Sequence, residues 1–423
     1  MFKSKQVANG VRVVSVETNN YKTAEINISM VLPLNEDSAA NALTINLLKR
    51  SCKDYPEFSL LRGKLDNLYG AAISAGALKS GESQVLTIGL TCLDDKFSLD
   101  GESIIKEGVE LLSSMLFKPN IRCKSFGKDN LEAERKLLIQ RIIDEQDDKR
   151  TYANQRLIEL MCKDEVYGRP KYGTIDEIKN VKMSDVYNSY LNLISKSLIQ
   201  VTYVGSLKSE EICDLFEKKF SSIERTPYKP YTEFITDCGE FKRFEEKLPV
   251  NQGKFVMGFR TGMKSSDDNY YAYKVMVDIF GGGTYSKLFT IIREKMSLCY
   301  YCRAVLGASK GICVVDCGID TENEKAAFEG ILKQLEDVKN GEFDDEVLDF
   351  SKKSIRERLT FSTPDAILGW YDSQCDDEEI LTPEFVIENV EKVTKQQVME
   401  CAGKMSLDTV FMIASEEVSE NED

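Results

Sequence analysis

Hydrophobic and polar positions alternate along several short stretches of this chain, and between them apolar positions recur every three or four residues. The first pattern is typical of β-strands, and the second of half-buried helices. In the first half, the predicted elements are a hairpin turning at Asn9-Gly10, a strand at 25–34, helices at 39–49 and 58–68, strands at 71–78 and 83–93, helices at 101–116 and 128–161, a helix from Ser184 and a strand at 199–205. In the second half, they are a strand at 253–260, helices at 269–280 and 288–295, strands at 298–306 and 311–319, helices at 324–339 and 344–361, a helix from Thr394 and a strand at 409–414.

The order of the predicted elements is nearly the same in the two halves. The helices that begin at Ser184 and Thr394 occupy matching places, and each is followed by a strand at nearly the same offset. Two copies of one α+β domain explain this repeat better than two unrelated domains do. The expected parts are a domain at 1–221, a linker at 222–248, a domain at 249–415 and an acidic tail at 416–423.

Composition narrows the class of partner. The chain has 423 residues and a formal net charge of −15, which argues against nucleic acid because phosphate binding requires a basic face. The first residues lack the apolar stretch of a secretory signal, and no apolar run approaches the ~20 residues of a membrane span. We therefore expect a cytoplasmic protein that binds neither nucleic acid nor membranes.

Twelve cysteines are present, and in a cytoplasmic protein we expect them to be reduced thiols. Two pairs stand out, Cys299 with Cys302 and Cys313 with Cys317. On a regular strand the first pair points to opposite faces, and the second pair shares a face at a separation of roughly 13 Å. Because a four-thiolate zinc site requires all sulfurs around one ion, core packing is favoured over metal binding for these residues.

The chain contains no histidine. This absence excludes a Ser-His-Asp or Cys-His nucleophile, a histidine general base and any histidine-ligated zinc. The remaining candidates for independent catalysis are an activated cysteine or paired carboxylates such as Asp147 and Asp148. Adjacent acids on a helix point in different directions, so a solvated helix face is the favoured interpretation of that pair.

Three segments together resemble the pitrilysin/insulinase family of zinc peptidases, also called inverzincins. They are NGVRVV at 9–14, YGRPKYGTIDEIKNV at 167–181 and GGGTYSKLFTIIREKMSLCYYCRA at 281–304. The resemblance covers nearly the whole chain, and the last segment is its most specific part. It implies two tandem insulinase-like α/β domains, each a mostly antiparallel sheet covered by helices, which form half of a clam-shell chamber.

The resemblance also shows what has been lost. In active members, two histidines of an HxxEH helix bind zinc, the glutamate between them activates water, and a downstream glutamate completes the site. The segment 42–56 matches that helix, with Ala42 and Asn46 at the histidine positions and Ile45 at the glutamate position. Arg141 stands at the downstream position, seven residues after Glu134. Since these side chains cannot together hold zinc, we expect no metal, no cofactor and no catalytic residue.

The resemblance further implies what has been kept. Active members carry an Arg/Tyr pair, seven residues apart, that contacts the substrate backbone, and Arg293 and Tyr300 have that spacing here. Gly281, Gly282 and Gly283 could let a peptide backbone approach closely. The alternatives are a salt-bridged Arg293 near a helix end, a Tyr300 packed on its strand, and a simple loop of glycines.

Some bacterial members divide the peptidase between an HxxEH chain and a chain that carries only the Arg/Tyr pair. This chain resembles the second kind, including members connected with 5-aminopentanol modification of elongation factor P. The expected function is a non-catalytic subunit that forms a heterodimer with an HxxEH-bearing paralogue and binds a peptide or protein substrate; a homodimer is the alternative assembly, and the sequence does not decide between them. A structural or assembly subunit and a stand-alone peptide-binding module remain as alternatives.

Overall fold

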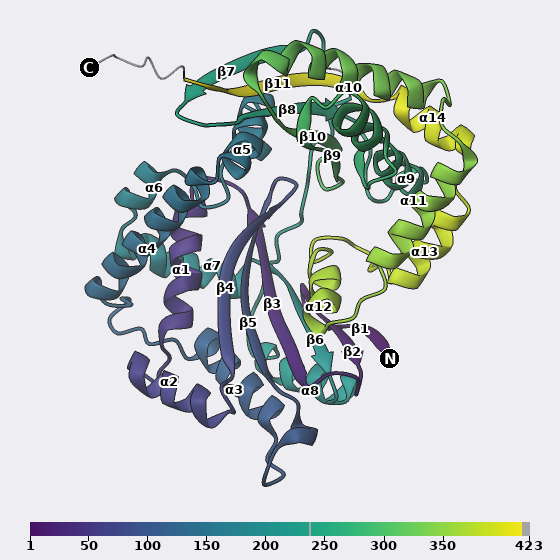
Figure 1. Cartoon of the computed structure of the whole chain (residues 1–423). Helices are drawn as coiled ribbons and strands as arrows, with labels where there is room; N and C mark the ends of the chain where they lie inside the picture. The colour runs from purple at the N-terminus through teal and green to yellow at the C-terminus, as the bar shows by residue number, and fades with distance from the viewer. Residues whose placement is uncertain (237, 417–423) are drawn as a thin grey trace. The chain divides into compact units, whose positions relative to one another are not determined.

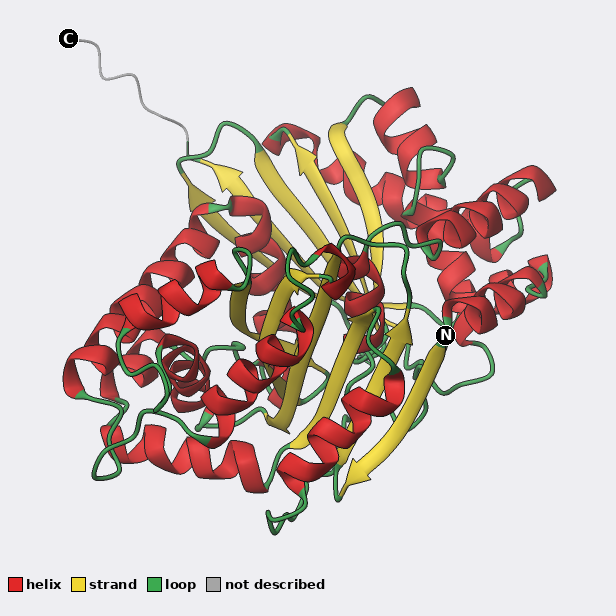
Figure 2. Cartoon of the chain, turned by 90° about the horizontal axis from the view of Figure 1, so that it is seen from below, coloured by secondary structure: helices red, strands yellow, loops and turns green. Residues whose placement is uncertain are grey.

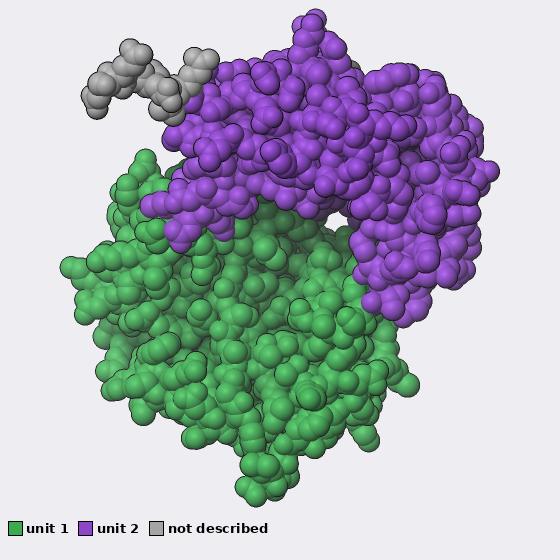
Figure 3. Space-filling model, viewed as in Figure 1, with its two compact units in different colours: residues 1–142, 169–231, 361–381 green, residues 143–168, 232–360, 382–423 purple. Residues whose placement is uncertain are grey.

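The computed structural model describes residues 1–236 and 238–416 (Figure 1). This part of the chain forms two compact units, and each unit draws segments from both halves of the sequence (Figure 3). Unit 1 comprises 1–142, 169–231 and 361–381, and unit 2 comprises 143–168, 232–360 and the chain from 382 onward. The tail expected at 416–423 lies outside the described residues, except for Glu416.

Unit 1 is built on a six-stranded sheet of order β1-β2-β6-β3-β5-β4. Its strands are β1 (Phe2–Ala8), β2 (Val11–Glu17), β3 (Thr23–Pro33), β4 (Ala72–Ser80), β5 (Ser83–Leu93) and β6 (Leu198–Gly205). Only the β2–β6 pair is parallel. The predicted hairpin is confirmed: β1 and β2 turn at Gly10, whose φ of 64° favours glycine.

Helices pack on one face of this sheet and enclose the core of unit 1. They are α1 (Ser38–Arg50), α3 (Ile104–Phe117), α7 (Met183–Ser195) and α8 (Ser209–Phe220). Alternate β3 residues such as Ile26, Ile28 and Met30 join the apolar side chains of these helices in one cluster. Unit 1 also contains α2 (Phe58–Asn67), most of α4 (Lys128–Asp147) and α6 (Ile175–Asn180).

The opposite face of the same sheet is polar and receives α12 (Pro364–Asp372), which contacts β3 and β6 (Figure 1). Asn27 Nδ2 donates to Asp372 at 2.6 Å, and Gln200 Nε2 donates to the Tyr371 carbonyl at 2.7 Å. Arg12 donates to the carbonyls of Gln374 and Asp377. Arg12, Asn27 and Gln200 therefore bind a segment that lies far along the sequence, which satisfies hydrogen bonds of these polar groups.

Asp372 provides a pH-dependent contribution to the stability of unit 1. Burial raises the pKa of its carboxyl to about 6, although hydrogen bonds from Thr202 and Asn27 act in the opposite direction. Because the folded pKa lies above the unfolded value of about 3.9, the contribution is fully present below pH 4 and is lost as the pH rises through 6. We expect unit 1 to gain about 2 kcal/mol of unfolding free energy between pH 7.5 and pH 4.5 from this group.

The measurement is urea unfolding at both pH values, followed by the fluorescence of Trp370, the single tryptophan of the chain. Trp370 belongs to α12 and donates to the Leu381 carbonyl, so its emission reports on unit 1. Burial also raises the pKa of Glu25 and of Asp376. The quantity compared is therefore the gain in unfolding free energy between pH 7.5 and pH 4.5 in the native chain minus the same gain in Asp372→Asn. An equal increment in the two proteins would show that Asp372 does not titrate as expected.

Unit 2 is built on a five-stranded sheet of order β7-β11-β8-β10-β9. Its strands are β7 (Lys242–Leu248), β8 (Gly253–Arg260), β9 (Cys299–Gly307), β10 (Ile312–Ile319) and β11 (Ser406–Ser415). Only the β7–β11 pair is parallel, so the sheet repeats the order and direction of β2-β6-β3-β5-β4 in unit 1. The predicted α+β class and the internal repeat are thereby confirmed. Strand β7 lies within the segment expected as a linker.

Helices cover both faces of this second sheet. Those on the α9 side include α9 (Tyr270–Gly281), α10 (Glu324–Lys339), α11 (Asp345–Arg358), α13 (Pro383–Glu391) and α14 (Lys395–Gly403). The other face packs on α5 (Lys149–Met161), as Leu157 and Val256 show in one apolar cluster. Figure 2 colours the strands of both sheets yellow and these helices red. None of the helices in the described ranges combines the length and apolar character needed to cross a bilayer.

The prediction of a single helix at 128–161 is wrong, because the helix is interrupted at Asp148 and two helices, α4 and α5, form in its place. Its carboxylate accepts hydrogen bonds from the Arg150 amide at 3.1 Å and from the Thr151 hydroxyl at 2.7 Å, which makes Asp148 the N-cap of α5. The Thr151 hydroxyl, which outweighs the small effect of burial, holds the pKa of Asp148 below its ordinary value. Asp148 therefore serves helix capping, and the exposed Asp147 lies on the preceding helix.

Candidate functional site

The helix that matches the HxxEH helix is a core helix. Ala42, Ile45 and Asn46 are all buried on α1, where eleven consecutive residues are buried. Arg141 lies exposed on α4. An alanine, an isoleucine and one amide offer no ligand set for zinc, so this region has the chemistry of packing and not of metal binding.

The glutamate that begins the downstream motif has a structural role instead. Glu134 accepts from Arg50 Nη1 at 2.8 Å, and Asn130 accepts from Arg50 Nε at 3.2 Å. Arg135 donates to the carbonyls of Ile178 and Val181. These bonds fasten α4 to the end of α1 and to the C-terminal end of α6.

Arg293 and Tyr300 are brought together in unit 2. Arg293 lies on η3 (Leu288–Lys295), which is a π-helix, and its Nε donates to the Tyr300 carbonyl at 3.0 Å. Nη1 donates to Glu294 at 2.8 Å, and the guanidinium lies 4.5 Å from the centre of the Phe289 ring. The arginine side chain is 39% exposed. The predicted alternative of a salt bridge near a helix end is therefore present, but it leaves the guanidinium open to solvent.

Tyr300 lies at a β-bulge. In the β9–β10 ladder, Tyr301 faces Gly318 while Cys299 faces Ile319, so Tyr300 is an extra, unpaired residue. A bulge turns the side chain away from the regular alternation of the strand. Tyr300 is 74% exposed as a result, and it does not pack on its strand as the alternative interpretation required.

The three glycines end α9 and begin the following turn. A Cβ at Gly281 would lie 2.5 Å from the Ala304 amide nitrogen, so glycine permits α9 to approach β9 closely. Cβ atoms at Gly282 and Gly283 would meet Asp278 and Tyr285, respectively. Local packing explains these glycines, and their approach to a peptide stays a prediction.

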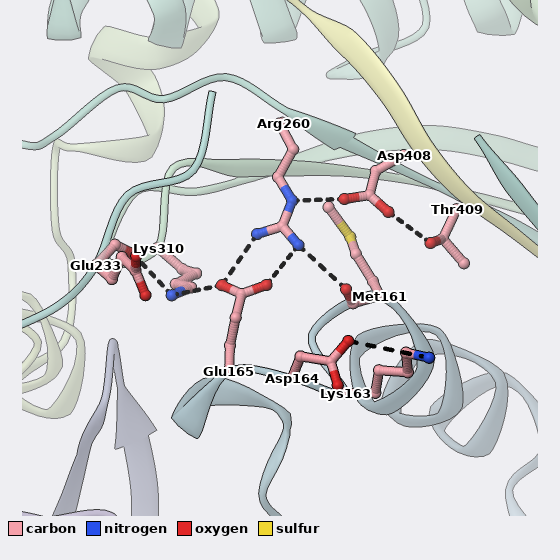
Figure 4. Close-up of polar contacts among 9 residues, drawn as sticks. All are labelled: Met161, Lys163, Asp164, Glu165, Glu233, Arg260, Lys310, Asp408 and Thr409. Atoms are coloured by element: carbon pink, nitrogen blue, oxygen red, sulfur yellow. Dashed lines mark hydrogen bonds and ion pairs between the residues drawn. The ribbon is translucent and has the colours of Figure 1, made fainter. Parts of the chain in front are cut away.

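Sequence reasoning missed a cluster of buried charges in unit 2, shown in Figure 4. Arg260 donates to Glu165 at 2.6 Å and to Asp408 at 2.7 Å, and Lys310 lies 2.7 Å from the other Glu165 oxygen. Lys310 also donates to the Glu233 carbonyl at 2.7 Å. The partners are too far apart in sequence for any local pattern to join them. Each charge is paired, which indicates a structural cluster that links the segment after α5 to β8, to β11 and to the turn between β9 and β10.

The cysteine geometry differs from the prediction. Cys299 and Cys302 were expected on opposite faces of a strand, but the bulge at Tyr300 inserts a residue and brings both to the same face. Cys302 and Cys317 face each other across the ladder with their sulfurs 2.8 Å apart. Hydrogen bonds from Cys302 and Cys317 hold the pKa of the Cys299 thiol well below its ordinary range, despite its burial. Cys313 is buried in the core, as predicted.

Comparisons with known proteins agree with this geometry. A family model described as the peptidase M16 inactive domain matches residues 180–355. The chain is 31% identical over 413 residues to the "probable inactive metalloprotease YmfF" of Bacillus subtilis (strain 168), and the match covers 96% of each protein.

Two solved structures have the same fold. With a conserved protein from Enterococcus faecalis V583, the TM-score is 0.87 at 24% sequence identity, and the match covers 100% of both chains. The peptidase M16 inactive domain from Pseudomonas fluorescens gives 0.81 at 15% identity, over 100% of this chain and 99% of that one. The resemblance to the pitrilysin/insulinase peptidases is confirmed: the chain belongs to the family of inactive metalloproteases with the peptidase M16 fold, and it is not an enzyme on its own.

Proposed function

We propose that this inactive metalloprotease is the non-catalytic subunit of a two-chain zinc peptidase or processing complex. Its partner is an HxxEH-bearing paralogue of the same family, which supplies the metal and the general base. This chain supplies Arg293 and Tyr300, which bind the backbone of a peptide or protein substrate. The two chains form a heterodimer around the substrate.

One observation carries the proposal: two departures from regular structure present this pair to solvent. A π-helix holds Arg293, and a bulge turns out Tyr300 within the same thirteen-residue stretch. Both irregularities are uncommon, and they recur at functional sites because they re-aim side chains at some cost in backbone regularity. A chain under selection for packing alone has no need for either one, whereas a chain that must present a guanidinium beside a phenol does.

The chemistry of the pair suits a peptide backbone. An arginine offers five N–H donors and a tyrosine offers one O–H donor, so together they can hold a carbonyl oxygen. Arg293 uses Nε for the Tyr300 carbonyl and Nη1 for Glu294, and among the described residues no acceptor contacts Nη2. Because Nε is anchored to the backbone of Tyr300, the guanidinium keeps a fixed relation to the bulge, which lowers the entropy lost on binding.

The experiment is reconstitution with the HxxEH paralogue from the same organism. The two chains, purified separately and mixed with zinc, are expected to form a 1:1 complex on size-exclusion chromatography and to hydrolyse peptides from a mixed peptide library. Either chain alone is expected to be inactive. The matched control replaces the paralogue's HxxEH glutamate by glutamine, which should preserve the complex and abolish hydrolysis.

Two outcomes would contradict the proposal. Absence of a complex at micromolar concentrations of both chains would favour a stand-alone peptide-binding module. A complex in which the paralogue alone is as active as the pair would favour an assembly role, in which the Arg/Tyr pair is incidental.

A further inference from the structure

We infer that Cys299, Cys302 and Cys317 form a binding site for one thiophilic d¹⁰ metal cation, Cu(I) or Zn(II). The three sulfurs all lie within 4.8 Å of one another. Within residues 1–236 and 238–416, this is the only group of three or more cysteine or acidic donors with such a spacing.

The fold gathers these thiols from two adjacent strands. Cys302 faces Cys317 directly across the β9–β10 ladder. The bulge at Tyr300 brings Cys299, three residues earlier on β9, to the same face. Cys302 shares its strand face with Ala304, whose amide lies close beneath Gly281 of α9. The group therefore lies on the face of the sheet that α9 covers, with Cys302 and Cys317 buried and Cys299 partly exposed.

The dimensions match a single ion. Zinc–sulfur bonds are about 2.3 Å long, so sulfurs around one ion lie roughly 4 Å apart. The observed group reaches that spacing with small rotations about the Cys side chains, because Cys302 and Cys317 are at 2.8 Å and the whole group spans at most 4.8 Å. Cys299 is the least buried residue of the three, although all three donor groups are enclosed.

The donor set selects the class of metal. Thiolates are soft ligands that favour Cu(I) and Zn(II) over Mg(II), Ca(II) or Mn(II), which prefer oxygen. Zinc is almost always four-coordinate, so a zinc ion here needs a water or an external group as its fourth ligand. A three-thiolate shell is complete for Cu(I). Both ions are bound by the same three thiolates, and the affinity of the chain for each ion distinguishes them.

This site is distinct from the lost peptidase site. Cys299, Cys302 and Cys317 belong to unit 2, whereas the positions of the former zinc ligands, Ala42 and Asn46, lie on α1 of unit 1. The inference rests on the arrangement of the thiols alone and stands whether or not the chain pairs with a paralogue.

The test is competitive metal titration of the full-length chain, reduced with a phosphine and stripped with a chelator. Cu(I) is added under argon against bicinchoninate, and Zn(II) is added in parallel against 4-(2-pyridylazo)resorcinol. We expect the native chain to remove one equivalent of at least one ion from its indicator. Cys299→Ala and Cys302→Ala are expected to weaken that binding at least tenfold, because each substitution removes one of the three thiolate ligands.

Cys313→Ala is the matched control, since Cys313 is as deeply buried as Cys317 on the same strand and lies outside the group. It is expected to bind like the native chain. Thermal unfolding by circular dichroism monitors the fold, and if Cys302→Ala unfolds, the partly exposed Cys299 decides the question. Retention of neither ion by the native chain, or equal binding by Cys299→Ala and Cys313→Ala, would overturn the inference.

Discussion

Replacing Glu165 by alanine is expected to lower the free energy of unfolding of unit 2 by about 3–5 kcal/mol. The carboxylate pairs with Arg260 at 2.6 Å and with Lys310 at 2.7 Å, and the three side chains are each at most 6% exposed. Alanine removes the carboxylate that binds both Arg260 and Lys310 inside the unit. Removal of one partner from a buried ion pair is among the few changes that destabilise a protein by this much.

The measurement is hydrogen exchange by mass spectrometry on peptides from β8 and β10, which reports on unit 2 separately from Trp370 in unit 1. Asp164→Ala is the matched control, because Asp164 is adjacent in sequence, and its side chain is 85% exposed in a weak pair with Lys163 (Figure 4). It is expected to change stability by less than about 0.5 kcal/mol. Equal effects of the two substitutions would show that the buried cluster does not stabilise unit 2.

The same cluster gives a pH signature. Burial acts to raise the pKa of Glu165, but hydrogen bonds and charge from Arg260 and Lys310 outweigh it and hold the pKa below its ordinary value. A depressed pKa adds stability that is fully present above the unfolded value of about 4.3 and is lost as the pH falls through the folded value. The difference in free energy of unfolding between the native chain and Glu165→Gln is therefore expected to be constant from pH 8 to pH 5 and to shrink below pH 4.

Much of the fold follows from local patterns. The Asn9-Gly10 hairpin, the alternating strands and the repeated order of elements predict two related α+β sheets, because side-chain periodicity reports directly on burial. One element that was not predicted, β7, lacks that signal. Strand β7 reads KRFEEKL, in which charged residues occupy five of seven positions, and its pairing with β11 is fixed by the neighbouring strand.

Long-range placement could not be predicted from the sequence. Helix α12 binds a polar face of unit 1 through Asn27 and Gln200, although it follows residues that belong to unit 2. Polar strand positions are usually taken as solvent-facing, so nothing local indicates that they bind a segment more than 150 residues away. The same limit applies to Glu165, Arg260 and Lys310.

The role of the candidate site stays a prediction. The family resemblance singled out Arg293 and Tyr300, and in the structure the two residues are joined by a hydrogen bond. The period-two argument failed for Cys299 and Cys302 because it assumes a regular strand, and one inserted residue reverses every side-chain direction before it. A bulge and a π-helix depend on the tertiary partners of the segment, so periodicity alone does not indicate them.

Arg293→Ala is expected to reduce kcat/KM of the reconstituted two-chain complex by about 10²–10³-fold, which is the usual cost of removing one donor that faces developing negative charge on a carbonyl oxygen. The expectation rests on the proposed function. The fold should be unchanged, because Arg293 is well exposed and its bonds within the chain are one to a neighbouring glutamate and one to the Tyr300 carbonyl.

Arg293→Lys is expected to recover little of the loss, since an ammonium cannot keep the bond to the Tyr300 carbonyl and also offer a planar pair of donors to the substrate. Tyr300→Phe removes only the phenolic donor and should give a smaller loss. Arg303→Ala is the matched control: Arg303 is an exposed arginine on the same strand as Tyr300, and it pairs with Asp316 of the neighbouring strand.

The readouts separate binding of the paralogue from catalysis. Size-exclusion chromatography is expected to show the same 1:1 complex for all four variants, while turnover falls only for the changes at Arg293 and Tyr300. Unchanged turnover in an intact Arg293→Ala complex would leave the π-helix and the bulge without a role in substrate binding. A loss of the complex itself would assign the pair to the interface between subunits, because a guanidinium presented beside an exposed phenol can bind a partner's backbone as readily as a substrate's.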